Sequence, residues 1–296
     1  MSALTRSAGS APRSKWMLGR VPVGVAMVLC AVYFFIPVWW LIVSSSKDAG
    51  SLYSGSSLWF SGPDRILTNL RLTFDYEGGI YLRWLANSVG YAVIGGVVAT
   101  IVAAAAGYSF AKFSFPGRNL LFTLVLGGVL VPGAALVMPL FLMMSSAHLT
   151  NTYWSVLLPS IVDPFGVYLA RIYVQSMVPD DLLNAARIDG ASELRIFRTM
   201  VLPNIMPGLV TIFLFQVVAI WNNFFLSLVM LSNTQLYPVT LGLDELNSQI
   251  SSVGATPGLI SIVLMGSLVS ILPLAIGFLS LQKYWRPTLV SSGFNG

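Results

Sequence analysis

Long apolar segments alternate with short polar ones along the chain. A helix that spans a bilayer needs about 20 predominantly apolar residues. Six segments reach that length, namely residues 21–43, 85–111, 120–144, 154–176, 205–231 and 259–281. The first is too long for the apolar core of a secretory signal, so it is interpreted as a retained anchor. The pattern predicts an all-α membrane protein whose six-helix domain covers residues 21–281, between an N-terminal tail (1–20) and a C-terminal tail (282–296).

Small residues recur every fourth position in the second predicted span, at Gly95, Ala99, Ala103 and Gly107. Side chains at this spacing share one helix face, where a neighbouring backbone can approach closely. That neighbour is either another helix of the same bundle or a second subunit, and the sequence leaves both open.

Prolines fall within or at the ends of these apolar segments, at positions 37, 132, 139, 159, 164, 207 and 273. Each removes a backbone donor and bends its helix, and broken helices occur at membrane depth mainly where they face protein or a cavity. The prolines therefore favour a translocation path. Asp163, the clearest ionisable residue within a span, is expected to line that path or to cap the helix that Pro164 begins.

The composition agrees with a membrane protein, because 56% of the residues are hydrophobic and only 9% are charged. Basic residues mark the cytoplasmic side of a membrane protein. Here they gather in alternate connections, while residues 145–153 and 232–258 contain no Lys or Arg. We therefore expect both termini in the cytoplasm. The net charge of +5 reflects this topology rather than nucleic-acid binding.

The sequence lacks the residue patterns that nucleotide binding, metal binding and ion coupling require. Each lysine is preceded by Ser, Ala or Gln rather than glycine, so the chain has no phosphate-binding loop. Cys30 and His148 are isolated, so no metal site is predicted. Ion-coupled carriers carry several ionisable groups within their spans, and their scarcity here disfavours a stand-alone secondary carrier. A membrane scaffold without a path remains a second alternative.

Residues 179–203 hold a dense group of charges between two spans. Asp180 and Asp181 after Pro179 indicate a helix start, with an aspartate available as cap. The helix is expected to end at Gly190, where a left-handed residue is easily accommodated. A second short helix should begin at Ser192 and run to residue 201. This elbow either lies on the membrane, through an apolar surface of Leu182, Ala185, Ala186 and Ile188, or docks a partner.

The elbow resembles the EAA loop of ABC importer permease subunits. The matching positions are Ala185, Ala186, Asp189, Gly190, Ala191, Phe197, Leu202, Pro203 and Pro207. The resemblance extends over nearly the whole chain, through segments such as "AGYSFAKFSFPGRNLLF", "VPGAALVMPLFLMM" and "WNNFFLSLVML". It is closest to the second permease of the carbohydrate group, the maltose-type or glycerol-phosphate-type branch.

This resemblance implies a type I importer fold in the cell membrane, with no catalytic residue and no cofactor on the chain. The implied partners are a second permease, a dimer of ATP-binding subunits that holds ATP and Mg²⁺, and an extracytoplasmic solute-binding protein.

The resemblance also implies roles for particular residues. The elbow would be the coupling helix, contacting the ATPase through Asp181, Leu182, Asn184, Ala185, Ala186, Asp189, Gly190, Ala191, Phe197 and Pro203. Asn222, Asn223 and Asp163 would face the path. The outer residues Asp244, Glu245, Asn247 and Gln249 would face the solute-binding protein. The tail after Gln282 is expected to contact the ATPase pair.

Two positions depart from the family pattern. Asn184 replaces the usual glutamate of the EAA loop, and Asn223 stands where an acid often follows Trp-Asn. Truncating one partner of a buried charge pair costs about 2–5 kcal/mol. We therefore expect either that the cognate ATPase lacks an arginine opposite Asn184 or that the site is wet enough to tolerate the missing glutamate. Which sugar is carried does not follow from the sequence.

Overall fold

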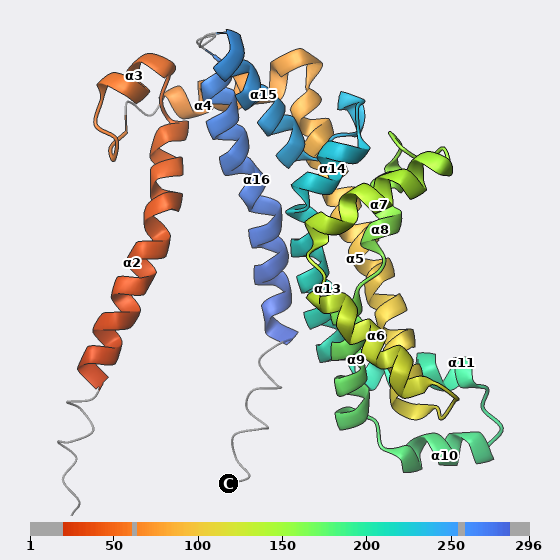
Figure 1. The fold of residues 1–296 in the computed structure, drawn as a ribbon. Coiled ribbons are helices and arrows are strands. Elements are labelled where there is room, and N and C mark those ends of the chain that lie inside the picture. The colour runs from red at the N-terminus through yellow and green to blue at the C-terminus, as the bar shows by residue number, and fades with distance from the viewer. Residues whose placement is uncertain (1–19, 61–63, 254–257, 285–296) are drawn as a thin grey trace, which may run out of the picture.

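A computed structural model describes residues 20–60, 64–253 and 258–284, and every regular element in these ranges is helical (Figure 1). In chain order the first elements are α2 (Arg20–Ser45), α3 (Ala49–Ser54), α4 (Asp64–Asp75), η1 (Tyr76–Gly78), α5 (Ile80–Lys112), α6 (Arg118–Leu130), α7 (Gly133–Ser146), α8 (Tyr153–Ser160) and α9 (Pro164–Met177). Then follow α10 (Asp180–Ile188), α11 (Glu193–Ile196), η2 (Phe197–Val201), α12 (Leu202–Asn204), α13 (Met206–Trp221), α14 (Phe224–Met230), η3 (Thr234–Leu236), α15 (Val239–Val253), α16 (Leu259–Leu281) and η4 (Gln282–Tyr284).

The predicted spans divide into continuous and broken helices. Within the described ranges, α2, α5 and α16 are each long and apolar enough to cross a membrane alone. The other predicted spans are interrupted. Helices α6 and α7 are bent by 107°, α8 and α9 by 40°, and the helical segment Glu193–Asn204 and α13 by 82°. The predicted span 205–231 is itself divided into α13 and α14 at Asn222 and Asn223. Prolines adjoin the first two breaks, as expected. No proline adjoins the division between α13 and α14.

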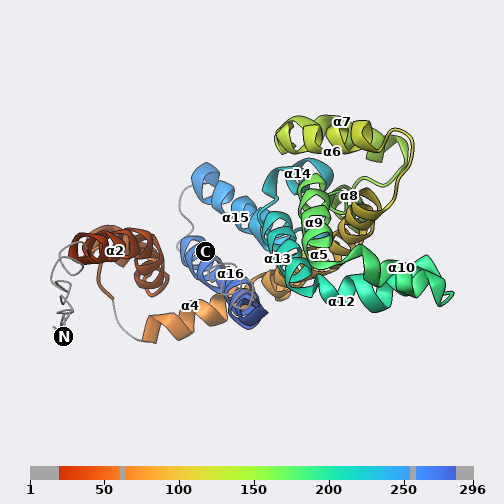
Figure 2. The same cartoon turned by 90° about the horizontal axis from the view of Figure 1, so that it is seen from below.

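Helix α5 is the centre of the bundle and packs against α9 and α13 (Figures 1 and 2). Its small-residue face makes this contact possible. Ala99 and Ala103 are buried, and a β-carbon on Gly107 would lie 2.5 Å from Cβ of Ala170 and 2.7 Å from the backbone nitrogen of Arg171. The stripe therefore serves packing within the chain, which resolves the alternative that the sequence left open.

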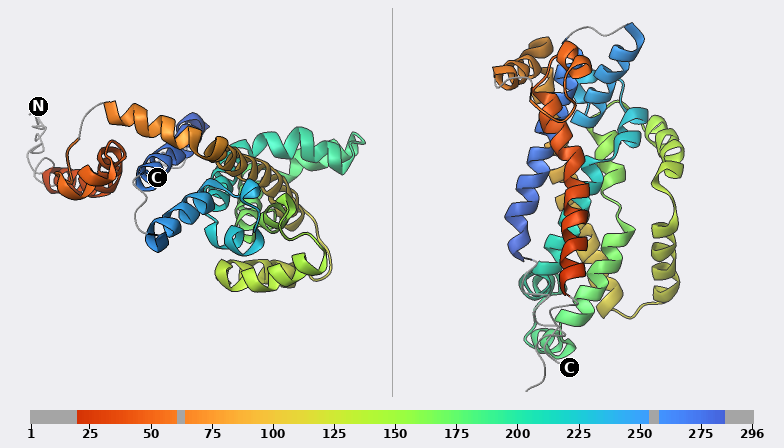
Figure 3. Two further views of the ribbon diagram at one scale, coloured as in Figure 1. Left: turned by 90° about the horizontal axis from the view of Figure 1, so that it is seen from above. Right: turned by 90° about the vertical axis from the view of Figure 1, so that its left-hand side faces the viewer.

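Helix α2 stands apart from the bundle and packs on α16 near its C-terminal end (Figures 1 and 3). A polar junction holds that end. The side-chain amide of Asn69 donates to the carbonyls of Ser45 at 2.7 Å and Lys47 at 2.9 Å. The Ser261 hydroxyl also donates to the Lys47 carbonyl at 3.1 Å, and the buried Lys47 ammonium donates to the carbonyl of Ser56. These bonds attach the C-terminal end of α2 and the residues that follow it to α4 and α16.

The contact of α5 with α9 generates a stability prediction. Replacing Gly107 by leucine is expected to lower the stability of the detergent-purified protein by about 1–3 kcal/mol, because the added side chain meets backbone. Thermal unfolding followed by circular dichroism measures the loss. Gly127→Leu is the matched control, since a β-carbon there has nothing within 4 Å. Equal losses in both variants would contradict the packing role of Gly107.

Candidate functional site

The elbow of residues 179–203 projects beyond the ends of the spans at one end of the molecule (Figure 1). Helix α10 ends before Gly190, whose φ of +77° is left-handed as the sequence predicts. The amide of Ala191 closes the turn by donating to the Ala186 carbonyl at 3.0 Å. Within the described chain, a β-carbon on Gly190 meets nothing within 4 Å. The bend is therefore open on its outer side.

One of the two predicted helix caps is present. The hydroxyl of Ser192 accepts a hydrogen bond from the Arg195 amide at 3.4 Å, which confirms the second start. The aspartate cap of α10 is wrong, because the residue before this helix is Pro179 and supplies no side-chain cap. Asp180 instead lies within the first turn, where a carboxylate interacts favourably with the helix dipole. It forms an ion pair with Lys112 at 2.6 Å.

The elbow is tied to the end of α5 at two points. The Lys112 ammonium donates to the carbonyl of Val178 at 2.6 Å, in addition to pairing with Asp180. The Tyr108 hydroxyl donates to the Glu193 carboxylate at 2.9 Å, and the Tyr108 ring stacks on Phe197 with centroids 5.7 Å apart. Both short helices of the elbow are therefore fixed to the central helix of the bundle.

Arg187 joins the two halves of the elbow to each other. Its Nε donates to Glu193 at 2.7 Å, and its Nη1 donates to the side-chain oxygen of Asn184 at 3.2 Å. The guanidinium holds the pKa of the Glu193 carboxyl below its ordinary value. Both partners are partly exposed, so water screens this pair and its contribution to stability is small. The pair fixes the relative direction of α10 and α11.

The predicted coupling residues divide into an outer and an inner set. Exposed positions are Asp181, Leu182, Asn184, Ala185, Asp189, Gly190 and Pro203. Ala186 is buried, so its assignment to the apolar docking surface is wrong, and Ala191 and Phe197 are half-buried. The exposed apolar side chains of the elbow are Leu182, Ile188 and Leu194. Leu194 was not among the residues predicted for the apolar surface, although its position shortly after a predicted helix start indicates exposure.

A cavity of about 430 Å³ lies where the three interrupted spans meet. The starts of α7 and α14 and the ends of α8 and α13 line it, with Gly133, Ser160, Asn222, Asn223 and Phe225 among the lining residues. The predicted path residues Asn222 and Asn223 are thus together. Asp163 does not line this cavity. Its carboxylate lies over Gly166 in the first turn of α9 and leaves no room for a β-carbon there.

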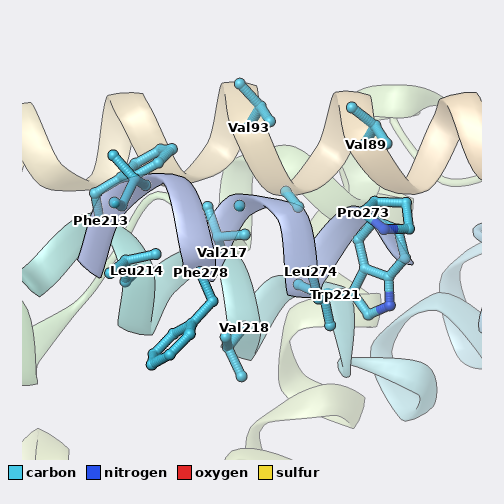
Figure 4. Close-up of a pocket in the computed structure, with 13 residues that line it drawn as sticks. Val89, Val93, Phe213, Leu214, Val217, Val218, Trp221, Pro273, Leu274 and Phe278 are labelled. Carbon is cyan, nitrogen blue, oxygen red and sulfur yellow. The ribbon is translucent and has the colours of Figure 1, made fainter. Parts of the chain in front are cut away.

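A second cavity of about 130 Å³ lies between α5, α13 and α16 (Figure 4). Val93 and Val89 of α5, Phe213 of α13 and Leu274 of α16 are among its walls. Its lining side chains are hydrocarbon apart from the indole of Trp221. Such a cavity suits an acyl chain or an apolar side chain rather than a hydrophilic solute.

The opposite end of the molecule carries α15, with Asp244, Glu245 and Asn247 exposed and Gln249 half-buried. The segment before this helix is fixed to α5 by hydrogen bonds. The side-chain amide of Asn87 donates to the carbonyls of Gln235 at 2.9 Å and Tyr237 at 3.0 Å. Residues 254–257 of the predicted outer loop lie outside the described residues.

Comparisons with known proteins agree with this architecture. The model of a family described as "Binding-protein-dependent transport system inner membrane component" matches residues 95–283. The chain is 33% identical over 288 residues to the arabinooligosaccharides transport system permease protein AraQ of Halalkalibacterium halodurans, covering 97% of this chain and 99% of that protein.

Other similar proteins differ in the substrate that they are named for. The lactose transport system permease protein LacG of Rhizobium radiobacter is 26% identical over 264 residues, covering 89% of this chain and 92% of that protein. A solved bacterial ABC transporter involved in the import of the acidic polysaccharide alginate has a chain with a TM-score of 0.77 and 22% identity. The match covers 94% of this chain and 100% of that one, and the likeness shows a type I importer permease fold.

The attachment of the elbow to α5 can be tested directly. Tyr108→Phe removes the hydroxyl that donates to Glu193, and a hydrogen bond to a charged group contributes about 1.5–3 kcal/mol. We expect faster amide hydrogen exchange in α10 and α11, measured by mass spectrometry on the purified protein. Tyr33→Phe on the exposed face of α2 is the matched control and should leave the elbow unchanged. Equal exchange in wild type and Tyr108→Phe would show that this bond does not hold the elbow.

Proposed function

We propose, from the premise that this chain belongs to the family of binding-protein-dependent transport system inner membrane components, that it is one of two permeases of an ATP-driven sugar importer. The observation that carries the proposal is the elbow. It exposes Leu182, Ile188 and Leu194 beyond the spans, and Tyr108 and Lys112 fix it to the central helix. An element of this kind transmits the movement of a docked partner into the bundle.

The partner at the elbow is a dimer of cytoplasmic ATP-binding subunits, which holds the ATP and Mg²⁺ that this chain has no motif to bind. Two observations support this side as cytoplasmic. Arg187, Arg195 and Arg198 lie on the elbow, and Lys112 lies at the α5 end that contacts it. Basic residues favour the cytoplasmic side, so both termini would lie there as well. Deletion of residues 291–296 would then weaken coupling to the ATPase, although this tail lies outside the described residues.

At the opposite end, α15 presents Asp244, Glu245, Asn247 and Gln249 to an extracytoplasmic solute-binding protein. The hydrogen bonds from Asn87 support this role, because they hold the start of the outer segment against α5. A second permease would complete the path around the cavity at the three helix breaks. Relatives named for arabinooligosaccharides and lactose support a sugar as the solute.

The first experiment is purification of the tagged protein from its native membrane in mild detergent, followed by mass spectrometry of stoichiometric partners. We expect a second permease and an ATP-binding subunit to co-purify. Gly190→Trp should abolish the ATPase association, because its side chain projects from the open side of the bend. Gly127→Trp, in α6, is the control and should keep it. Recovery of the protein alone would return the secondary carrier to consideration, whereas an intact complex with indifferent path residues would favour the scaffold.

A second experiment concerns Asn184. Its side-chain oxygen already accepts from Arg187, which also binds Glu193. Asn184→Glu is therefore expected to draw Arg187 away from Glu193 and to leave coupled transport equal or lower, provided that the cognate ATPase lacks the opposing arginine. ATP-dependent solute uptake in membrane vesicles measures this. A marked rise in uptake with the native ATPase would refute the matched-partner proposal. Asn204→Glu, at an exposed position directly after the elbow, controls for added charge.

A further inference from the structure

The second half of the elbow continues into one helical segment, Glu193–Asn204, which leads directly to α13. We call this segment the surface helix. Its axis is bent by 82° from that of α13. Because α13 belongs to a span, a helix nearly perpendicular to it lies along the membrane surface rather than across the bilayer. Helix α11, which begins the surface helix, lies closer to the spans than α10 does (Figure 1). The surface helix is therefore at the level where α13 enters the membrane.

One side of the surface helix is attached to the bundle. Ile196 and Val201, together with Ile205 just beyond the helix, are fully buried in a cluster with residues of α5, α9 and α10. The step from Ile196 to Val201 is five residues long. The π-helical turn Phe197–Val201 accommodates this step, because its hydrogen bonds join residues five apart. The inner side of the helix is thus fixed by apolar packing.

The opposite side of the surface helix is exposed and basic. It carries Arg195 and Arg198, which are three positions apart and therefore neighbours on the helix. Thr199 is exposed beside them. Met206, at the start of α13, is 47% exposed and gives this side an apolar end. Basic side chains next to an exposed apolar one are typical of helices that lie at the lipid–water interface.

Arg195 and Arg198 differ from the neighbouring cations in having no partner within the described part of the chain. Neither side chain forms an ion pair or a hydrogen bond there. The other basic side chains of residues 105–221 are engaged, namely Lys112 with Asp180, Arg187 with Glu193, Arg118 with the carbonyl of Phe113 and Arg171 with the ring of Phe122. The two free guanidinium groups can therefore bind an external anion.

The two helices of the elbow also differ in charge. Helix α10 begins with Asp180 and Asp181, and Asp189 follows its last residue. The one acidic residue of the surface helix is Glu193, whose carboxylate accepts from Arg187 at 2.7 Å and from Tyr108 at 2.9 Å. The outer side of the surface helix is therefore positive without a competing carboxylate. Anionic lipids give the cytoplasmic leaflet a negative surface, which complements this side.

We propose that the outer side of the surface helix binds the headgroups of anionic phospholipids in the cytoplasmic leaflet. Arg195 and Arg198 contact the phosphates, and Met206 lies among the first carbons of the acyl chains. The assignment rests on the proposed function, because it takes from it the cytoplasmic position of the elbow. The elbow then has two separate surfaces, with α10 facing the ATP-binding subunit and the surface helix facing lipid.

Photo-crosslinking identifies the molecule that covers this side. The complex purified with its partners is placed in nanodiscs with equal amounts of phosphatidylcholine and phosphatidylglycerol. Thr199→p-benzoylphenylalanine provides a photoreactive side chain at an exposed position, and mass spectrometry identifies its adducts. We expect phosphatidylglycerol adducts to exceed phosphatidylcholine adducts by about 5-fold or more, since one Lys or Arg near an anionic surface contributes roughly that preference.

Three sets of variants in this background test the role of charge. Arg195→Gln combined with Arg198→Gln should remove the preference for phosphatidylglycerol. Arg195→Lys combined with Arg198→Lys should keep it, because both charges remain. Arg71→Gln, at an exposed position of α4, is the control and should leave the preference unchanged. High salt should weaken the preference of the wild-type arginines by screening.

The same method separates failure of this proposal from failure of the proposed function. Ile188→p-benzoylphenylalanine, on the 86% exposed position of α10, should crosslink to the ATP-binding subunit. Absence of that adduct would contradict the proposed function, whatever is found at position 199. The lipid surface is refuted if position 199 yields no lipid adduct, reacts instead with the ATP-binding subunit or the second permease, captures both lipids equally, or keeps its preference in the glutamine variant.

Discussion

The structure depends on one constraint, which is that backbone N–H and C=O groups within hydrocarbon must find partners inside the protein. The continuous helix α5 satisfies it through its own hydrogen-bond ladder, whereas Pro37 in α2 and Pro273 in α16 each remove one backbone donor from an otherwise continuous ladder. The three interrupted spans satisfy it only because their breaks meet around a shared cavity, where side chains such as Asn222 and Asn223 and bound polar molecules can supply partners. The breaks and the cavity that they surround are therefore linked by a single requirement, whereas the small residues on α5 serve the close packing of α5 on α9.

Rigid contacts connect the elbow to that cavity. Tyr108 and Lys112 fix the elbow to α5, and α5 packs tightly on α9 and α13. The break before α9 and the break after α13 both adjoin the cavity. Moving a two-state transporter almost completely from one state to the other takes about 5.5 kcal/mol of differential binding. A partner at the elbow can deliver such a difference to the cavity because the intervening helices are packed closely and cannot absorb the movement.

Local sequence patterns predicted those features that depend on nearby residues. The apolar segments, the left-handed Gly190 and the cap at Ser192 follow from periodicity and backbone preference alone. The missing cap of α10 arose because Asp180 is drawn to Lys112, 68 positions earlier in the chain. Likewise Ala186 is buried because it belongs to an apolar cluster that includes Tyr108 of α5, Val174 of α9 and Ile196 of α11. The break at Asn222 lacks a proline, and an apolar run with two amides does not reveal the cavity that separates α13 from α14.

The charged residues near the interrupted spans lie away from the cavity, so its described walls are polar in part and uncharged. Asp163 directly precedes α9 and Arg171 lies within it, and each is engaged locally, Asp163 with the first turn of α9 and Arg171 with the ring of Phe122. Neither lines the cavity, whose described walls combine apolar side chains with the amides of Asn222 and Asn223, the hydroxyl of Ser160 and backbone groups. Ion or proton coupling requires a titratable or charged group that senses the solute. A cavity of neutral groups can bind and release a neutral solute as its shape changes, and under the proposed function the energy for that change would arrive through the elbow.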